Sequence, residues 1–192
     1  MIRESEITSK TSLELLNSLI GQQFRFVGGP ALWEGMNADR VLVATSNNVI
    51  SFNCDLVELS FEGLADEYNI VTIVAASEPD VSTSQNKGYI YLQHANEEIK
   101  SISIVEEEVL ESSGVTKNWK FVSDVAWILT METGSLVITK LNHHMESLKV
   151  DFVTNFDKFK IPRTESRFEE NILTSLSVFR RTLSLEEASA RL

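Results

Sequence analysis

The hydrophobic pattern of the chain is mainly that of β-strands. Apolar and polar positions alternate in short runs, as they do in a strand with one buried face. The segment Val57–Glu62 alternates strictly, and Ile70–Ala76 is apolar on both faces, which predicts a central strand. Strands are predicted at residues 24–27, 40–46, 49–54, 56–61, 69–76, 89–92, 99–105, 119–131, 135–141 and 147–154.

A short amphipathic helix is expected near the N-terminus. Thr11 and Glu14 have the spacing of a capping box, in which each side chain bonds the backbone N–H of the other residue. Leucines from Leu13 to Leu19 follow with the period of a helix. We therefore expect a helix over residues 12–20 with one apolar stripe.

The apolar period becomes helical again after Pro162. Ser184 and Glu187 have the spacing of a capping box, which predicts a final short helix from about residue 185. We expect a C-terminal helical segment over residues 164–192 that docks on the sheet or forms a homodimer contact. Its stripe consists of Phe168, Ile172, Leu176, Phe179 and Leu183.

Two stretches of the chain share a β-meander pattern. Residues 33–76 and 119–154 each begin with a tryptophan and continue into hairpin-connected strands, which allows an internal duplication. Any two antiparallel meanders share this much, and a repeated fold does not identify a function. We predict a single α+β domain over residues 1–192. It is a mostly antiparallel, twisted sheet or partly open barrel with an N-terminal helix and C-terminal helices.

The excess negative charge lies in the β-rich part of the chain. Residues 1–148 carry 9 Lys/Arg and 21 Asp/Glu, a net −12, whereas residues 149–192 carry 8 and 7, a net +1. Such a body repels phosphate backbones, which argues against a nucleic-acid partner. It would attract a basic protein, although acidity also serves solubility alone.

Two features are candidate partner-binding residues. Trp33 lies in a loop flanked by glycine and proline, where an exposed tryptophan can anchor an interface, or can fold back over one end of the sheet. The run Glu106, Glu107 and Glu108 is either part of an acidic patch that binds a partner or a solvated strand end.

The sequence contains no convincing catalytic or metal-binding motif. His143 and His144 are adjacent, so in an extended segment they point to opposite faces and are poorly placed to ligate one metal ion. Cys54 is the only cysteine, and neighbouring Asp55 disfavours its thiolate, so we expect a buried structural residue. We predict no catalytic residue, no metal and no cofactor.

The N-terminal residues are polar and lack the apolar segment of a signal peptide. No apolar run approaches the roughly 18–20 residues of a membrane-spanning helix. We therefore expect a cytoplasmic protein without a membrane partner.

Three functions are compatible with these features. The first is a non-enzymatic protein-binding module, similar in kind to immunity or inhibitor proteins, whose acidic surface binds a basic protein. The second is a small-ligand-binding β-barrel with Trp33, Tyr89 and Tyr91 near a pocket. The third is an enzyme of unrecognised type, which requires polar residues that converge in a cleft.

Overall fold

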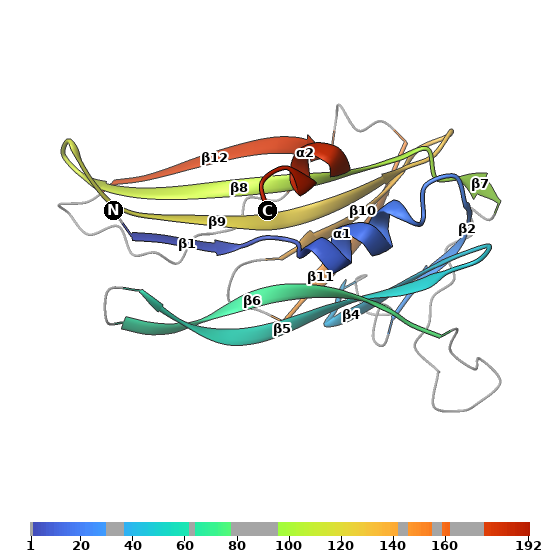
Figure 1. Cartoon of the computed structure of the whole chain (residues 1–192), viewed down its shortest axis with the longest axis horizontal. Helices are drawn as coiled ribbons and strands as arrows, with labels where there is room; N and C mark the ends of the chain where they lie inside the picture. Colours follow the sequence, from blue (N-terminus) through green and yellow to red (C-terminus); the bar gives the residue numbers. More distant parts are fainter. Residues whose placement is uncertain are drawn as a thin grey trace.

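Two open β-sheets face each other in the structure (Figure 1). This computed structural model describes residues 2–29, 37–61, 64–77, 96–141, 146–154, 159–161 and 175–192. The predicted antiparallel α+β class is confirmed, but the partly open barrel is wrong, because the strands divide into two separate sheets.

The larger sheet has seven strands. Its order is β12 (Ser175–Ser184), β8 (Ser101–Ser113), β9 (Thr116–Thr130), β10 (Ser135–Lys140), β11 (Leu148–Val153) and β3 (Asn37–Ala38). The seventh strand, β1 (Ile2–Glu6), runs parallel to the first half of β9, while β10 pairs with its second half. Strand β1 was not predicted from the sequence, because its residues are mostly polar and show no apolar alternation.

The smaller sheet has five strands. Its order is β6 (Leu64–Ala75), β5 (Val49–Phe61), β4 (Arg40–Thr45), β2 (Gln23–Gly28) and β7 (Glu97–Glu98). The two predicted strands at 49–54 and 56–61 are one continuous strand, paired with β6 along its length from Ile50 to Phe61. The predicted meanders lie in different sheets, β4–β5–β6 in this one and β9–β10–β11 in the other. Their duplication stays a prediction.

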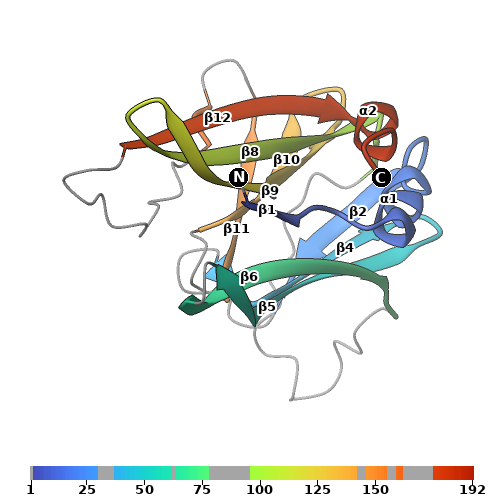
Figure 2. The ribbon, with the colours of Figure 1, turned by 60° about the vertical axis from the view of Figure 1, so that its left-hand side comes forward.

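The two described helices are short and lie next to each other (Figure 2). Helix α1 (Lys10–Asn17) is capped by Ser9, whose Oγ accepts the N–H of Ser12 at 3.2 Å, so the predicted Thr11 cap is wrong by two residues. Helix α2 (Leu185–Ser189) begins after Ser184 with the predicted capping box.

The predicted C-terminal helix is wrong over residues 175–184, which form β12. This strand pairs with β8 along its whole length, from Ser175 opposite Ser112 to Ser184 opposite Ser103. Local helical spacing could not reveal this pairing, because the partner strand lies far away in the sequence. The part of the predicted helix before residue 175, with Phe168 and Ile172, lies outside the described residues.

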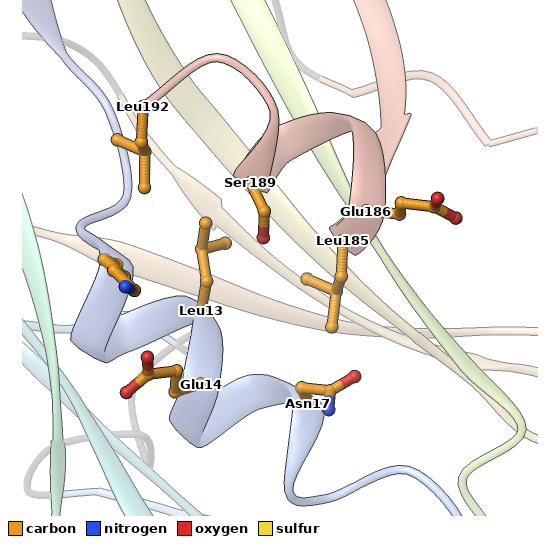
Figure 3. Close-up of a pocket in the computed structure, with 8 residues that line it drawn as sticks. Leu13, Glu14, Asn17, Leu185, Glu186, Ser189 and Leu192 are labelled. Atoms are coloured by element: carbon orange, nitrogen blue, oxygen red, sulfur yellow. The ribbon is translucent and has the colours of Figure 1, made fainter.

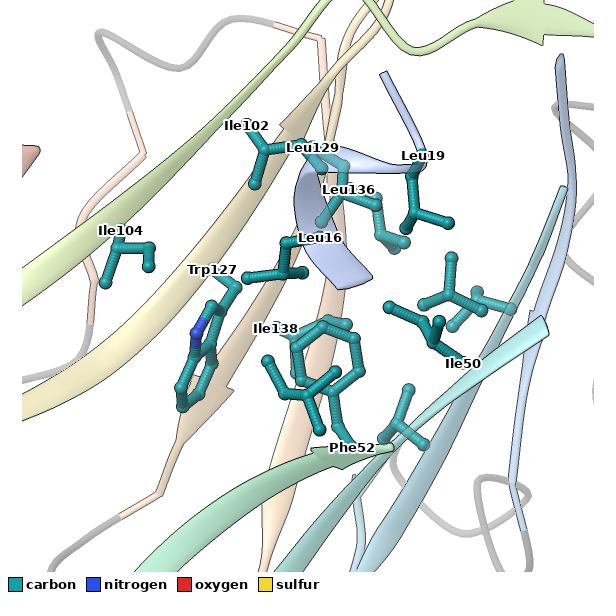
Figure 4. Packing of buried hydrophobic residues seen from close by; sticks show 14 of the residues in the cluster. Leu16, Leu19, Ile50, Phe52, Ile102, Ile104, Trp127, Leu129, Leu136 and Ile138 are labelled. Carbon is teal, nitrogen blue, oxygen red and sulfur yellow. The ribbon is translucent and has the colours of Figure 1, made fainter. Parts of the chain in front are cut away.

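One buried apolar cluster joins both sheets and both helices (Figure 4). Large side chains that fill it include Leu16 from α1, Phe52 from β5 and Trp127 from β9. The Phe52 and Trp127 rings meet edge to face across the two sheets, with centroids 5.6 Å apart. Burial of this kind supplies most of the driving force for folding, and it leaves the space between the sheets packed here.

Candidate functional site

A buried pair of carboxylates lies where β8 and β9 meet the end of the chain. A bulge gives β9 one extra residue opposite the step from Val105 to Glu106, and this places Asp124 directly opposite Glu106. Both carboxylates are buried, Glu106 at 4% and Asp124 at 1% exposure. Two like charges at opposite positions of neighbouring strands repel unless a cation lies between them.

Arg191 supplies that cation from two residues beyond α2. Its Nη1 donates to Asp124 Oδ1 at 2.8 Å and to Glu106 Oε2 at 2.7 Å, and its Nη2 donates to Asp124 Oδ2 at 2.6 Å. The guanidinium therefore binds one carboxylate with two hydrogen bonds and bridges it to the other. Thr8 completes the shell, since its N–H and Oγ1 both donate to Asp124 Oδ2 at 2.6 Å.

Glu106 also pairs with the next strand. Its Oε1 accepts from Arg181 Nε at 2.7 Å, across the β8–β12 pair. Burial alone would raise the pKa of Glu106, but the hydrogen bonds from Arg181 and Arg191 outweigh it and hold the pKa below its usual range. Glu106 is therefore a structural anion that ties the C-terminus to the sheet.

The neighbouring acidic residues are also engaged within the chain. Glu107 is 1% exposed and accepts from Arg180 Nε at 2.6 Å, while half-buried Glu108 pairs with Lys120. The expected solvated strand end is thus wrong for Glu106 and Glu107, which lie inside a long β8. The partner-binding role of this run stays a prediction, but its carboxylates do not form an exposed patch.

Lys140 and Cys54 are two further buried titratable groups between the sheets. Lys140 Nζ donates to the Asn69 carbonyl oxygen at 3.1 Å. Burial lowers the pKa of Lys140, although Cys54, Glu6 and nearby carboxylates partly offset this. Burial also raises the pKa of the Cys54 thiol to about 11, so it is protonated at neutral pH and is a poor nucleophile, as its expected structural role requires.

A second carboxylate pair is exposed on the hairpin formed by β5 and β6. Glu58 and Glu67 lie directly opposite each other, and both are exposed. Asp55, on the same strand as Glu58, is exposed as well. Residues 41–86 contain seven Asp/Glu and no Lys or Arg. This gap in basic residues is visible in the sequence, although it is less conspicuous than the run Glu106–Glu108.

A groove of about 670 Å³ runs between the two helices (Figure 3). Leu13 from α1 and Leu185 from α2 form its apolar part, with Leu192 beyond them. Glu14 and Glu186 also line it. A second pocket of about 260 Å³ lies beside β12, with Arg180 and Arg181 in its lining. Neither pocket is lined by Cys54, Lys140 or Asp124.

Several residues considered from the sequence lie outside the described residues: Trp33, Tyr89, Tyr91, His143 and His144. Within the described part of the chain, no group of three or more His, Cys, Asp or Glu side chains is arranged to hold a metal ion. Neither described helix has the length and apolar character needed to cross a membrane.

Comparison with protein-family models, curated proteins and solved structures found no match to this chain.

Proposed function

We propose that the chain is a non-enzymatic protein-binding module that receives a basic partner on its β5–β6 hairpin. The observation that carries the proposal is the exposed pair of Glu58 and Glu67. The two side chains are exposed and directly opposite each other, so they concentrate acidic groups at one accessible place on the hairpin. The absence of Lys and Arg over residues 41–86 leaves the negative field of this hairpin without a basic residue in its own segment.

The position of the hairpin supports this function. Its closed end lies at the opposite end of the molecule from β7 (Figure 1). By strand alternation, Glu58 and Glu67 continue the row of Cys54 and Asn69, which faces the core. This row of side chains is thus buried near Cys54 and Asn69 and becomes exposed and acidic toward the end of the hairpin, where a partner can reach it. Electrostatic attraction there would speed association more than it would strengthen the complex.

An enzyme is less well supported than a binding module. The buried charges of Asp124, Glu106 and Arg191 satisfy one another, and the Cys54 thiol is protonated at neutral pH. A ligand-binding β-barrel is also less well supported, because the sheets are open and the described space between them is packed with side chains.

The test is affinity capture from an extract of the source organism at low and moderate salt, with quantitative mass spectrometry. We compare the natural chain with Glu58→Lys/Glu67→Lys. The matched control is Glu98→Lys/Glu132→Lys, which has the same net charge and alters exposed acids elsewhere.

The expected result is a basic protein retained by the natural chain and by the control, lost from the hairpin variant and weakened by salt. Equal retention by the hairpin variant would overturn the proposal. So would the absence of any specifically retained protein at low salt.

A further inference from the structure

β12 forms one edge of the seven-stranded sheet and exposes two adjacent apolar side chains. It pairs with β8 on one side and ends the described strand order on the other. Val178 is 48% exposed and Phe179 is 57% exposed. An edge strand of this kind is a template for another strand, and proteins usually protect such edges.

The outer edge of the other sheet shows such protection. On β6, Ser12 Oγ donates to the Ile73 carbonyl at 3.2 Å and accepts the Ile73 N–H at 3.4 Å. Lys140 Nζ binds the Asn69 carbonyl on the same strand. A helix side chain and a buried charge therefore occupy backbone groups of β6. On β12 the residues Val178 and Phe179 are exposed, and no strand is described beyond it.

The positive charges on β12 are balanced by carboxylates on the neighbouring strand β8. Arg180 pairs with Glu107 and Arg181 with Glu106, and in each pair the arginine Nε donates a hydrogen bond to the carboxylate. This balance matters for two identical edges, which would otherwise bring two pairs of uncompensated arginines together. The paired arginines therefore favour a second copy of the chain as the occupant, since an acidic partner strand is not needed to neutralise them.

We propose that a second copy of this chain pairs antiparallel with β12, on a two-fold axis at Phe179. Antiparallel pairing of a strand with itself is self-complementary, as a two-fold dimer requires. In this register Phe179 packs against Phe179 of the other copy, and aromatic pairs at opposite positions are favourable. Arg180 then lies opposite Val178 and Arg181 opposite Ser177, so no arginine directly faces an arginine. The seven-stranded sheets of the two copies then form one continuous sheet.

The register is tested by disulfide trapping in a Cys54→Ala background. Opposite residues have Cβ atoms about 4.5–5.5 Å apart, so Phe179→Cys should form an intermolecular disulfide after mild oxidation. The matched control is Ser177→Cys. Its mate on the other copy would be four residues further along the strand, roughly 13 Å away, which is too far for a disulfide.

Sedimentation equilibrium of the natural chain provides the second measurement. We expect a concentration-dependent dimer, and we expect Phe179→Asp to weaken it at least about tenfold, because a charge would be buried at the axis. A monomer over about a hundredfold range of concentration would overturn the proposal. Equal trapping of Ser177→Cys and Phe179→Cys would also overturn it. This surface is on the other sheet from the acidic hairpin, so either proposal can fail alone.

Discussion

In each of two carboxylate pairs the members lie directly opposite each other on neighbouring strands, but the surroundings of the two pairs differ. Glu106 and Asp124, on β8 and β9, are buried and bridged by Arg191. Glu58 and Glu67, on β5 and β6, are exposed in a segment without any Lys or Arg. The first pair lies inside the fold with a cation between its members, and the second pair lies at the surface.

The difference shows that the density of acidic residues along a chain does not locate a binding surface. The most acidic run of the sequence, Glu106–Glu108, is the one that the fold neutralises. Three of its four cations come from far along the chain: Arg180, Arg181 and Arg191 lie 73 to 85 residues from the glutamates that they bind. Three substitutions test this difference between the two pairs.

The largest effect is expected for Asp124→Ala. It removes the carboxylate that holds Arg191 and Thr8 and leaves a guanidinium partly buried with one hydrogen-bonding acid fewer. Breaking a buried ion pair costs about 3–5 kcal/mol, so the free energy of unfolding should fall by that amount in urea titrations.

Glu132→Ala is the matched control. Glu132 pairs with Lys100 at 3.6 Å, but both side chains are exposed, and removal of an exposed pair changes stability by less than about 1 kcal/mol. If both variants lost the same stability, the buried pair would not be the structural element described here.

Glu106→Gln should have an intermediate effect that depends on pH. The pKa of Glu106 is below its usual range in the folded state, so its carboxylate adds stability at pH values above the ordinary glutamate pKa. That contribution is lost as the pH falls through the lowered folded-state pKa. At neutral pH the variant should be less stable by about 2 kcal/mol, the scale of hydrogen bonds to charged groups.

The measurement is urea unfolding of both proteins from neutral pH to acid. The gap in the free energy of unfolding should be widest near pH 7 and should close as the pH falls. A gap that stayed constant with pH would mean that Glu106 acts through packing rather than through its charge.

The smallest effect is expected for Glu58→Lys, and it has the opposite sign. The change converts a like-charge pair with Glu67 into an opposite-charge pair, which should stabilise the protein by about 0.2–1 kcal/mol. Thermal unfolding at low salt is the measurement, with Glu98→Lys as an exposed control of equal charge. A loss of stability, or an equal gain in the control, would contradict the view that this hairpin carries repulsion.

The sequence determined the local features of this protein. Strict alternation at Val57–Glu62 and the apolar run Ile70–Ala76 predicted strands, and the structure has residues 57–61 in β5 and residues 70–75 in β6. The capping box at Ser184 predicted the start of α2. These features depend on the period of side chains within one element and on hydrogen bonds between residues three apart, which neighbouring residues suffice to specify.

Strand pairing and the burial of charged residues depend on tertiary contacts. Leu176, Phe179 and Leu183 have helical spacing, yet pairing with β8 makes this segment a strand. The polar β1 is a strand because it pairs with β9. The bulge that sets Asp124 opposite Glu106, and the arrival of Arg191 between them, join residues far apart in the sequence. Backbone pairing and the desolvation of charges depend on what lies next to a residue in space, so local periodicity could not predict which acidic residues become buried.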